Sequence, residues 1–163
     1  MSITFNADEI FEMAEEIERN AEKFYRQAAK IAPDKETKKY FLDLAVMEAG
    51  HLITFEEMRA QLSPQEKTQS LFDPDNQAAL YLKTMADSRG WEGKASPTDE
   101  FYGDEKIEDI LKIAVDAEKN SVVFYTGIKD LVPPKVGKDK IEAIIKEELG
   151  HIAALNKRLA ELI

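Results

Sequence analysis

Hydrophobic residues recur every three or four positions along most of the chain, which is the spacing of one face of an α-helix. Asn6 is expected to cap the first helix, over residues 7–32, and Glu9 completes a capping box three residues later. Pro33 and Asp34 end this helix and begin the next. The apolar face of the first helix is formed by Ile10, Ala14, Ile17, Ala21, Phe24, Ala28 and Ile31.

The same spacing predicts three further helices, over about 34–62, from Asp104 as the cap to about Leu131, and over about 138–162. Pro133 and Pro134 separate the last two. Residues 63–104 are rich in turn formers and form a long crossover, in which "NQAALYLKTMAD" predicts a short helix. We therefore expect one all-α domain over residues 1–163. Its two antiparallel hairpins, about 6–62 and 105–163, form a four-helix bundle. The pattern fits a bundle without any site equally well.

The amino-acid composition limits which partners the protein can bind and which reactions it can catalyse. The net charge of −10 argues against nucleic acid and anionic membranes as partners and favours a cation. The chain has no cysteine, which excludes disulfides, thiol catalysis, Cys-ligated zinc and iron–sulfur clusters. The start "MSITFNADE" lacks a basic, apolar leader, and no apolar run reaches about 18 residues. We expect a cytoplasmic protein that does not enter a membrane.

The chain contains an internal repeat with an offset of 100 residues. The stretch "EEIERNAEKFY" at 15–25 matches "VDAEKNSVVFY" at 115–125, and "MEAGH" at 47–51 matches "EELGH" at 147–151. A helical hairpin is therefore duplicated. The matched pairs are Glu18 with Glu118, Asn20 with Asn120, Phe24 with Phe124, Tyr25 with Tyr125, Glu48 with Glu148, Gly50 with Gly150, and His51 with His151.

The repeat places polar residues at positions that face the predicted core. Each hairpin has one Glu on its first helix and Glu-x-x-His on its second, and residues three apart project from one helix face. Four unpaired carboxylates in a core would be very costly, whereas two divalent cations would neutralise them. The sequence thus predicts a two-metal site, with Glu48 and Glu148 as the expected bridges. The expected ligands are Glu18, Glu48, His51, Glu118, Glu148 and His151.

Two Glu-x-x-His motifs, each preceded by a Glu thirty residues upstream, resemble the rubrerythrin-like members of the ferritin-like di-iron carboxylate proteins. The resemblance covers nearly the whole chain apart from the crossover. It implies a ferritin-like bundle with two iron ions, alternatives being manganese, mixed iron and manganese, or zinc in vitro. It further implies reduction of hydrogen peroxide or dioxygen with electrons from a separate donor protein, with no catalytic residue beyond the metal ligands. A ferroxidase or iron-handling protein, or a module with a structural metal site, stays an alternative.

Tyr25 and Tyr125 lie seven residues after Glu18 and Glu118, at almost the same helical angle. The resemblance implies that they hydrogen-bond to ligand carboxylates. The alternative is two core tyrosines with no role at the site.

The chain departs from rubrerythrins at two points. Ser121 stands where they usually carry an additional Glu ligand, so the site has six ligands, closer to bacterioferritin-like centres. We also expect no Cys-rich rubredoxin tail, because the sequence has no cysteine. Both departures argue against a direct transfer of peroxidase activity.

Two expectations concern packing. Gly50 and Gly150 are expected to let a neighbouring helix approach closely. The third helix is apolar almost all round, with Val115, Val122 and Val123 where the first repeat has charged residues. A helix apolar on more than one face is buried on more than one face. We expect the crossover helix or a second subunit to cover it, and the latter predicts a homodimer.

Overall fold

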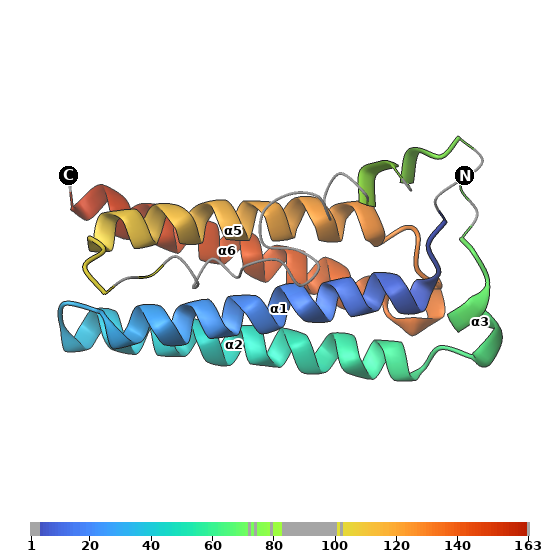
Figure 1. The fold of residues 1–163 in the computed structure, drawn as a ribbon, viewed down its shortest axis with the longest axis horizontal. Coiled ribbons are helices and arrows are strands. Elements are labelled where there is room, and N and C mark those ends of the chain that lie inside the picture. The colour runs from blue at the N-terminus through green and yellow to red at the C-terminus, as the bar shows by residue number, and fades with distance from the viewer. Residues whose placement is uncertain are drawn as a thin grey trace.

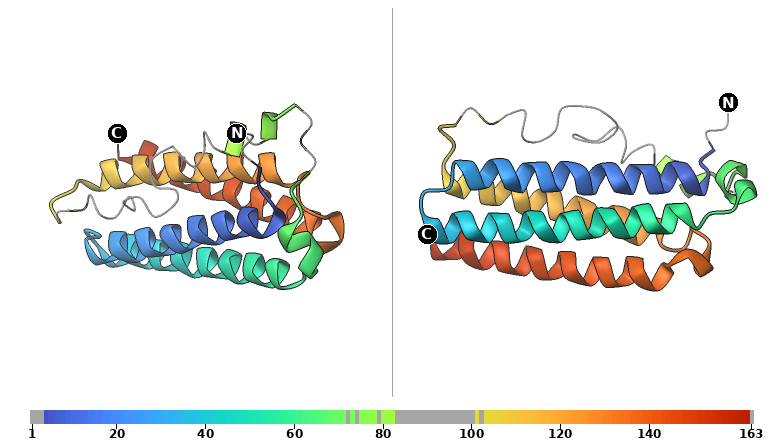
Figure 2. Two further views of the ribbon diagram at one scale, coloured as in Figure 1. Left: turned by 45° about the vertical axis from the view of Figure 1, so that its right-hand side comes forward. Right: turned by 90° about the horizontal axis from the view of Figure 1, so that it is seen from below.

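Four long helices form an all-α bundle, as the hydrophobic pattern predicts (Figure 1). They are α1 (Ala7–Lys30), α2 (Lys35–Ala60), α5 (Ile107–Ile128) and α6 (Lys138–Glu161). Helices α1 and α2 lie side by side as one antiparallel hairpin, and α5 and α6 form the other (Figures 1 and 2). The computed structural model describes residues 4–71, 73, 75–78, 80–82, 101 and 103–162.

The ends of the first hairpin's helices follow the local sequence. The side chain of Asn6 accepts a hydrogen bond from the Glu9 amide at 2.9 Å, and the Glu9 carboxylate accepts one from the Asn6 amide at 2.9 Å. The predicted capping box is therefore confirmed. Asp34 caps α2 by accepting a hydrogen bond from the Thr37 amide at 2.7 Å.

The prediction that Asp104 caps the third helix is wrong. Helix α5 begins at Ile107, and its N-cap residue, Lys106, has an extended backbone (φ −74°, ψ 143°) and makes no side-chain cap. Glu108 and Asp109 lie in the first turn, where negative charge stabilises the positive end of the helix dipole, so the helix begins there without a capping side chain. The helix ends at Ile128, before the predicted Leu131.

The crossover contains a short helix that was not predicted, because this part of the chain is rich in turn-forming residues. Helix α3 (Pro64–Thr68) begins at Ser63, which forms a capping box with Glu66. Pro64 follows the cap, where its missing N–H costs nothing. The predicted helix over 76–87 is described only in part: residues 77–78 and 80–82 are helical, and the rest lies outside the described residues.

The crossover covers part of α5. Tyr81 donates a hydrogen bond to the carbonyl oxygen of Val123, and Leu82 is buried in the core. A Cβ at Gly127 would lie 2.3 Å from the Tyr81 ring, so only glycine admits this contact. The Val123 side chain nevertheless remains 50% exposed. The expected second layer therefore covers α5 incompletely, and the homodimer stays a prediction.

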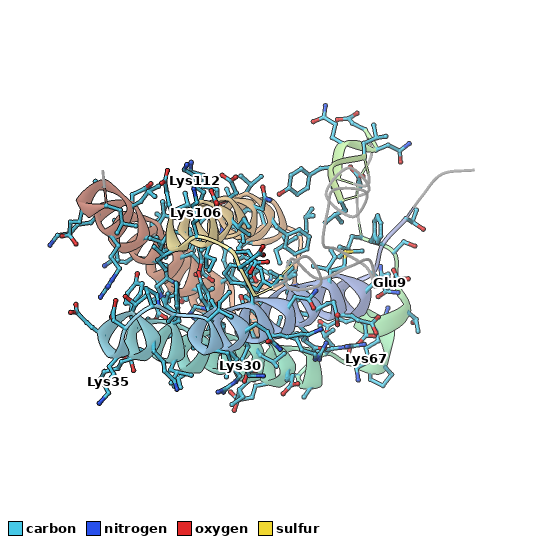
Figure 3. All side chains as sticks on the ribbon, turned by 60° about the vertical axis from the view of Figure 1, so that its left-hand side comes forward. Glu9, Lys30, Lys35, Lys67, Lys106 and Lys112 are labelled. Atoms are coloured by element: carbon cyan, nitrogen blue, oxygen red, sulfur yellow. The ribbon has the colours of Figure 1, made fainter. Side chains whose placement is uncertain are left out.

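The core consists of two apolar clusters along the bundle. One contains Phe11 and Phe55, near the start of α1 and the end of α2. The other contains Phe41 and Leu155, near the opposite end of the bundle. The repeated Glu and His residues lie between these clusters on all four helices. Charged side chains such as Lys35 and Lys112 extend from the outer surface (Figure 3). Among the described helices, none is long and apolar enough to cross a membrane.

The expectation that Gly50 and Gly150 pack against a neighbouring helix is wrong. A Cβ at either position would meet no atom within 4 Å, because both glycines lie on the exposed side of their helices. A glycine within a helix costs roughly 1 kcal/mol relative to alanine. No packing contact in the described chain offsets this cost at either glycine.

Replacing these glycines is therefore expected to stabilise the fold. Gly50→Ala and Gly150→Ala should each raise the free energy of unfolding by about 0.5–1 kcal/mol, measured by urea denaturation. Gly127→Ala is the matched control and should destabilise, because its Cβ would clash with the Tyr81 ring. A loss of stability in Gly50→Ala comparable to that in Gly127→Ala would contradict this account.

Candidate metal centre

The six expected ligands meet in the middle of the bundle. All are at most 5% exposed, and they come from all four long helices. They form two overlapping groups, in each of which one ligand atom per residue lies within 4.8 Å of the others. The groups are Glu18, Glu48, His51 and Glu148, and Glu48, Glu118, Glu148 and His151. Glu48 and Glu148 belong to both, which is the placement expected of bridging carboxylates.

The Nδ1 atoms of both imidazoles face the carboxylates. Nδ1 of His51 lies 3.4 Å from Glu48 Oε2 and 3.2 Å from Glu148 Oε1. Nδ1 of His151 lies 3.3 Å from Glu48 Oε1 and 2.8 Å from Glu148 Oε2. The two rings are nearly parallel, with an interplanar angle of 25° and centroids 6.1 Å apart. Each Glu-x-x-His pair thus forms one side of the cluster.

Several of these buried atoms have no hydrogen-bond partner among the residues that the structure describes. Both oxygens of Glu148, the Nδ1 atoms of both histidines, Glu18 Oε2 and Glu48 Oε1 are unsatisfied. A buried polar atom left without a partner costs about 1–3 kcal/mol, and native proteins keep few of them. These atoms nevertheless lie close together, with Nδ1 of each histidine 2.8–3.4 Å from oxygens of Glu48 and Glu148. Carboxylate oxygens and imidazole nitrogens suit iron, manganese or zinc, so the residues fit a pair of divalent ions.

Burial and neighbouring charge divide the four carboxyl groups into two kinds when no metal is bound. Burial raises the pKa of Glu18 and Glu118 well above the ordinary value, and the charge of Glu48 raises both further. Burial acts on Glu48 in the same direction, but the two imidazoles outweigh it and lower the pKa of Glu48 to about 2. The pKa of Glu148 is lowered for the same reason. The raised pKa of Glu18 and Glu118 favours their protonated form, and the lowered pKa of Glu48 and Glu148 favours their ionised form.

The imidazoles take the opposite charge. Burial lowers the pKa of each, but the surrounding carboxylates outweigh burial and raise the pKa of His151 to about 12. They raise the pKa of His51 as well. The raised pKa of both imidazoles favours their charged form, which offsets part of the negative charge of the carboxylates when no metal is bound. Because ligands bind metal in their deprotonated form, metal binding displaces protons from the cluster.

The two tyrosines connect the hairpins at the centre. Tyr25 of α1 donates a hydrogen bond to Glu118 of α5, and Tyr125 of α5 donates one to Glu18 of α1. Burial raises the pKa of both hydroxyls well above 10, so they remain protonated donors. The predicted tyrosine–carboxylate hydrogen bonds are confirmed, and each crosses to the opposite hairpin. Each one holds Oε1 of its carboxylate and so fixes the orientation of that side chain.

Sequence reasoning missed one residue in contact with the cluster. Oε2 of Glu147 on α6 lies 2.7 Å from Nε2 of His51, on the side of the ring away from the central carboxylates. The acidic doublet Glu147-Glu148 was the only signal for it. At the position of the absent seventh ligand, the hydroxyl of Ser121 donates to the carbonyl of Ala117 in its own helix.

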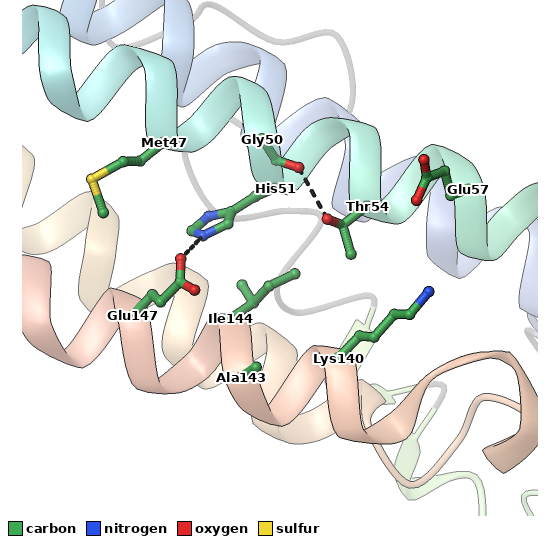
Figure 4. Close-up of a pocket in the computed structure, with 9 residues that line it drawn as sticks. All are labelled: Met47, Gly50, His51, Thr54, Glu57, Lys140, Ala143, Ile144 and Glu147. Carbon is green, nitrogen blue, oxygen red and sulfur yellow. Dashed lines mark hydrogen bonds and ion pairs between the residues drawn. The ribbon is translucent and has the colours of Figure 1, made fainter.

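A pocket of about 540 Å³ opens between α2 and α6 beside His51 (Figure 4). Its charged lining residues are Glu57, Lys140 and Glu147. His51 extends between the two helices toward Glu147, while Glu57 and Lys140 lie further along them (Figure 4). The other lining residues are Met47, Gly50, Thr54, Ala143 and Ile144. A small molecule in this pocket would contact the outer edge of the His51 ring.

The fold and the buried Glu/His cluster define a ferritin-like four-helix-bundle protein with a candidate two-metal centre. The sequence model of the rubrerythrin family matches residues 9–96, and the chain belongs to this family. A similar solved structure is that of a protein from Thermotoga maritima described as a ferritin-like diiron-carboxylate protein. It is 24% identical, each chain is covered over 98% of its length, and the TM-score is 0.77. This likeness confirms the predicted ferritin-like fold. No curated protein sequence matches the chain.

Proposed function

We propose that the chain binds two iron ions through the six clustered ligands and reduces hydrogen peroxide or dioxygen. The observation that carries this proposal is the pair of overlapping ligand groups that share Glu48 and Glu148. The description of the similar Thermotoga maritima protein as a diiron-carboxylate protein favours iron. Manganese or zinc would suit the same donors, and the test must identify the metal. With no cysteine in the chain, electrons come from a separate donor protein.

Two bound ferrous ions would supply the two electrons that, with two protons, reduce one hydrogen peroxide to two water molecules. Glu48 and Glu148 would fix the spacing of the two metal positions, because both carboxylates belong to both groups. Tyr25 and Tyr125 hold the outer carboxylates and act as hydrogen-bond donors, not as nucleophiles. The apolar clusters on either side exclude water. The pocket beside His51 would bring a small oxidant to the outer edge of that ring.

The test is anaerobic mixing of the reduced, iron-loaded protein with one equivalent of hydrogen peroxide in a stopped-flow spectrometer. We expect both irons to be oxidised within seconds, faster than free ferrous ion at the same concentration. A second addition of reductant should restore the starting spectrum, because a redox enzyme must cycle.

Two comparisons make this result decisive. Zinc-loaded protein should show no spectral change with peroxide, because zinc has no accessible redox step. Oxidation no faster than that of free ferrous ion, or zinc as the metal of the protein isolated from its natural source, would contradict the proposal. Either result would favour a structural metal site.

A further inference from the structure

The two halves of the centre differ in one contact, although the hairpins are duplicated. Nε2 of His51 lies 2.7 Å from Oε2 of Glu147, within hydrogen-bond distance. Nε2 of His151 is buried and has no hydrogen-bond partner among the described residues. The repeat places Met47 where the second half has Glu147, and a thioether is only a weak hydrogen-bond acceptor. Among the described residues, therefore, only His51 has a carboxylate on the outer side of its ring.

This contact determines how well His51 can serve as a ligand. A hydrogen bond from Nε2–H to a carboxylate fixes the tautomer that leaves the Nδ1 lone pair free, and it raises the basicity of Nδ1. Nδ1 of His51 is the atom that faces Glu18, Glu48 and Glu148. Nδ1 of His151 receives no such support from the described part of the chain. An outer partner of this kind typically changes metal affinity about 10–100-fold.

We propose that Glu147 is a positioning residue that makes the metal position beside His51 the tighter of the two. The inference rests on the proposed two-metal site and adds an order of filling to it. The first ion binds to the group of Glu18, Glu48, His51 and Glu148, and the second to the group that contains Glu118 and His151. Glu147 also lines the pocket between α2 and α6, so the tighter position is the one beside the opening.

The test is an anaerobic titration of the metal-free protein with cobalt(II), followed by calorimetry and by the visible absorption of the bound ion. The unsubstituted chain should bind two ions in two steps whose affinities differ about 10–100-fold. Glu147→Met copies the residue of the other half and should weaken the first step until the two merge. Glu147→Gln keeps a hydrogen-bond acceptor and should fall between the two. Met47→Glu should strengthen the second step.

Control variants assign the steps and separate positioning from overall charge. Glu57→Met removes the same charge from the same pocket away from His51, and it should leave both steps unchanged. His51→Ala should abolish the tighter step, whereas His151→Ala should leave it. Glu147 is 53% exposed, so its substitution should not prevent folding, which circular dichroism checks.

Three outcomes would overturn the inference. They are two steps of equal affinity in the unsubstituted chain, an unchanged first step in Glu147→Met, and equal weakening by Glu57→Met and Glu147→Met. Each would leave the proposed two-metal site in place. A chain that binds no cobalt and no iron would instead contradict the proposed function itself.

Discussion

Glu48→Ala is expected to lose tight binding of both metal ions, whereas Glu18→Ala should lose only one. Both side chains are 1% exposed and undergo the same truncation, so the two variants are matched controls for folding and cavity formation. They differ because Glu48 belongs to both ligand groups and Glu18 to one. We expect each affected step to weaken beyond the roughly 10–100-fold typical of losing an outer partner. Metal analysis after anaerobic loading and desalting gives the number of ions retained.

Histidine substitutions test the same ligand set independently. His51→Ala and His151→Ala should each lower the metal content, because each imidazole belongs to one group only. Equal metal content in Glu48→Ala and Glu18→Ala would contradict the bridging role of Glu48. Unchanged content in both histidine variants would show that the ligand set itself is wrong.

The position of the cluster could be predicted from the sequence because the duplication repeats it. Glu18 and Glu118 lie on core-facing stripes, and a polar residue that both halves retain at such a position requires a physical reason. Helical geometry then places Glu48 beside His51 and Glu148 beside His151. Four helices with one long crossover left few ways of arranging these faces, and the structure brings all six residues together.

Glu147 could not be found in this way because a repeat reveals only what its halves share. Met47 occupies the equivalent position, so the comparison of the halves misses the contact that, among the described residues, distinguishes the two imidazoles. The pocket beside His51 was equally hidden, since it depends on the separation of α2 and α6. Only the structure shows which sequence differences between the duplicated halves change a contact at the site.

The errors in the fold have a similar origin. Asp104 is a good capping residue by type, but the chain enters the helix only after Lys106, and residue type does not fix where the backbone turns. Gly50 suggested a close approach, yet the space around it is empty. The sequence shows where a glycine lies, but only the structure shows whether a neighbouring group packs against it.

Removing metal is expected to lower the melting temperature by about 8–16 °C for each tightly bound ion. An ion present at 1,000 times its dissociation constant stabilises the fold by about 4 kcal/mol, because it binds the folded state alone. For a domain of this size, each 1 kcal/mol corresponds to about 2–4 °C. Scanning calorimetry of loaded protein and of chelated protein with verified metal content measures the shift.

The lower melting temperature of the metal-free protein is expected to come from the lost metal-binding energy more than from repulsion among the carboxylates. Without metal, the raised pKa values of Glu18, Glu118 and the two imidazoles favour bound protons, which reduce carboxylate repulsion, so the metal-free bundle should fold. Metal must displace these protons, and acid favours their retention, so affinity and the shift in melting temperature should both shrink as pH falls. Glu48→Ala serves as the control, since added metal should no longer raise its melting temperature. Equal melting temperatures for verified metal-free and loaded protein would contradict the predicted metal centre.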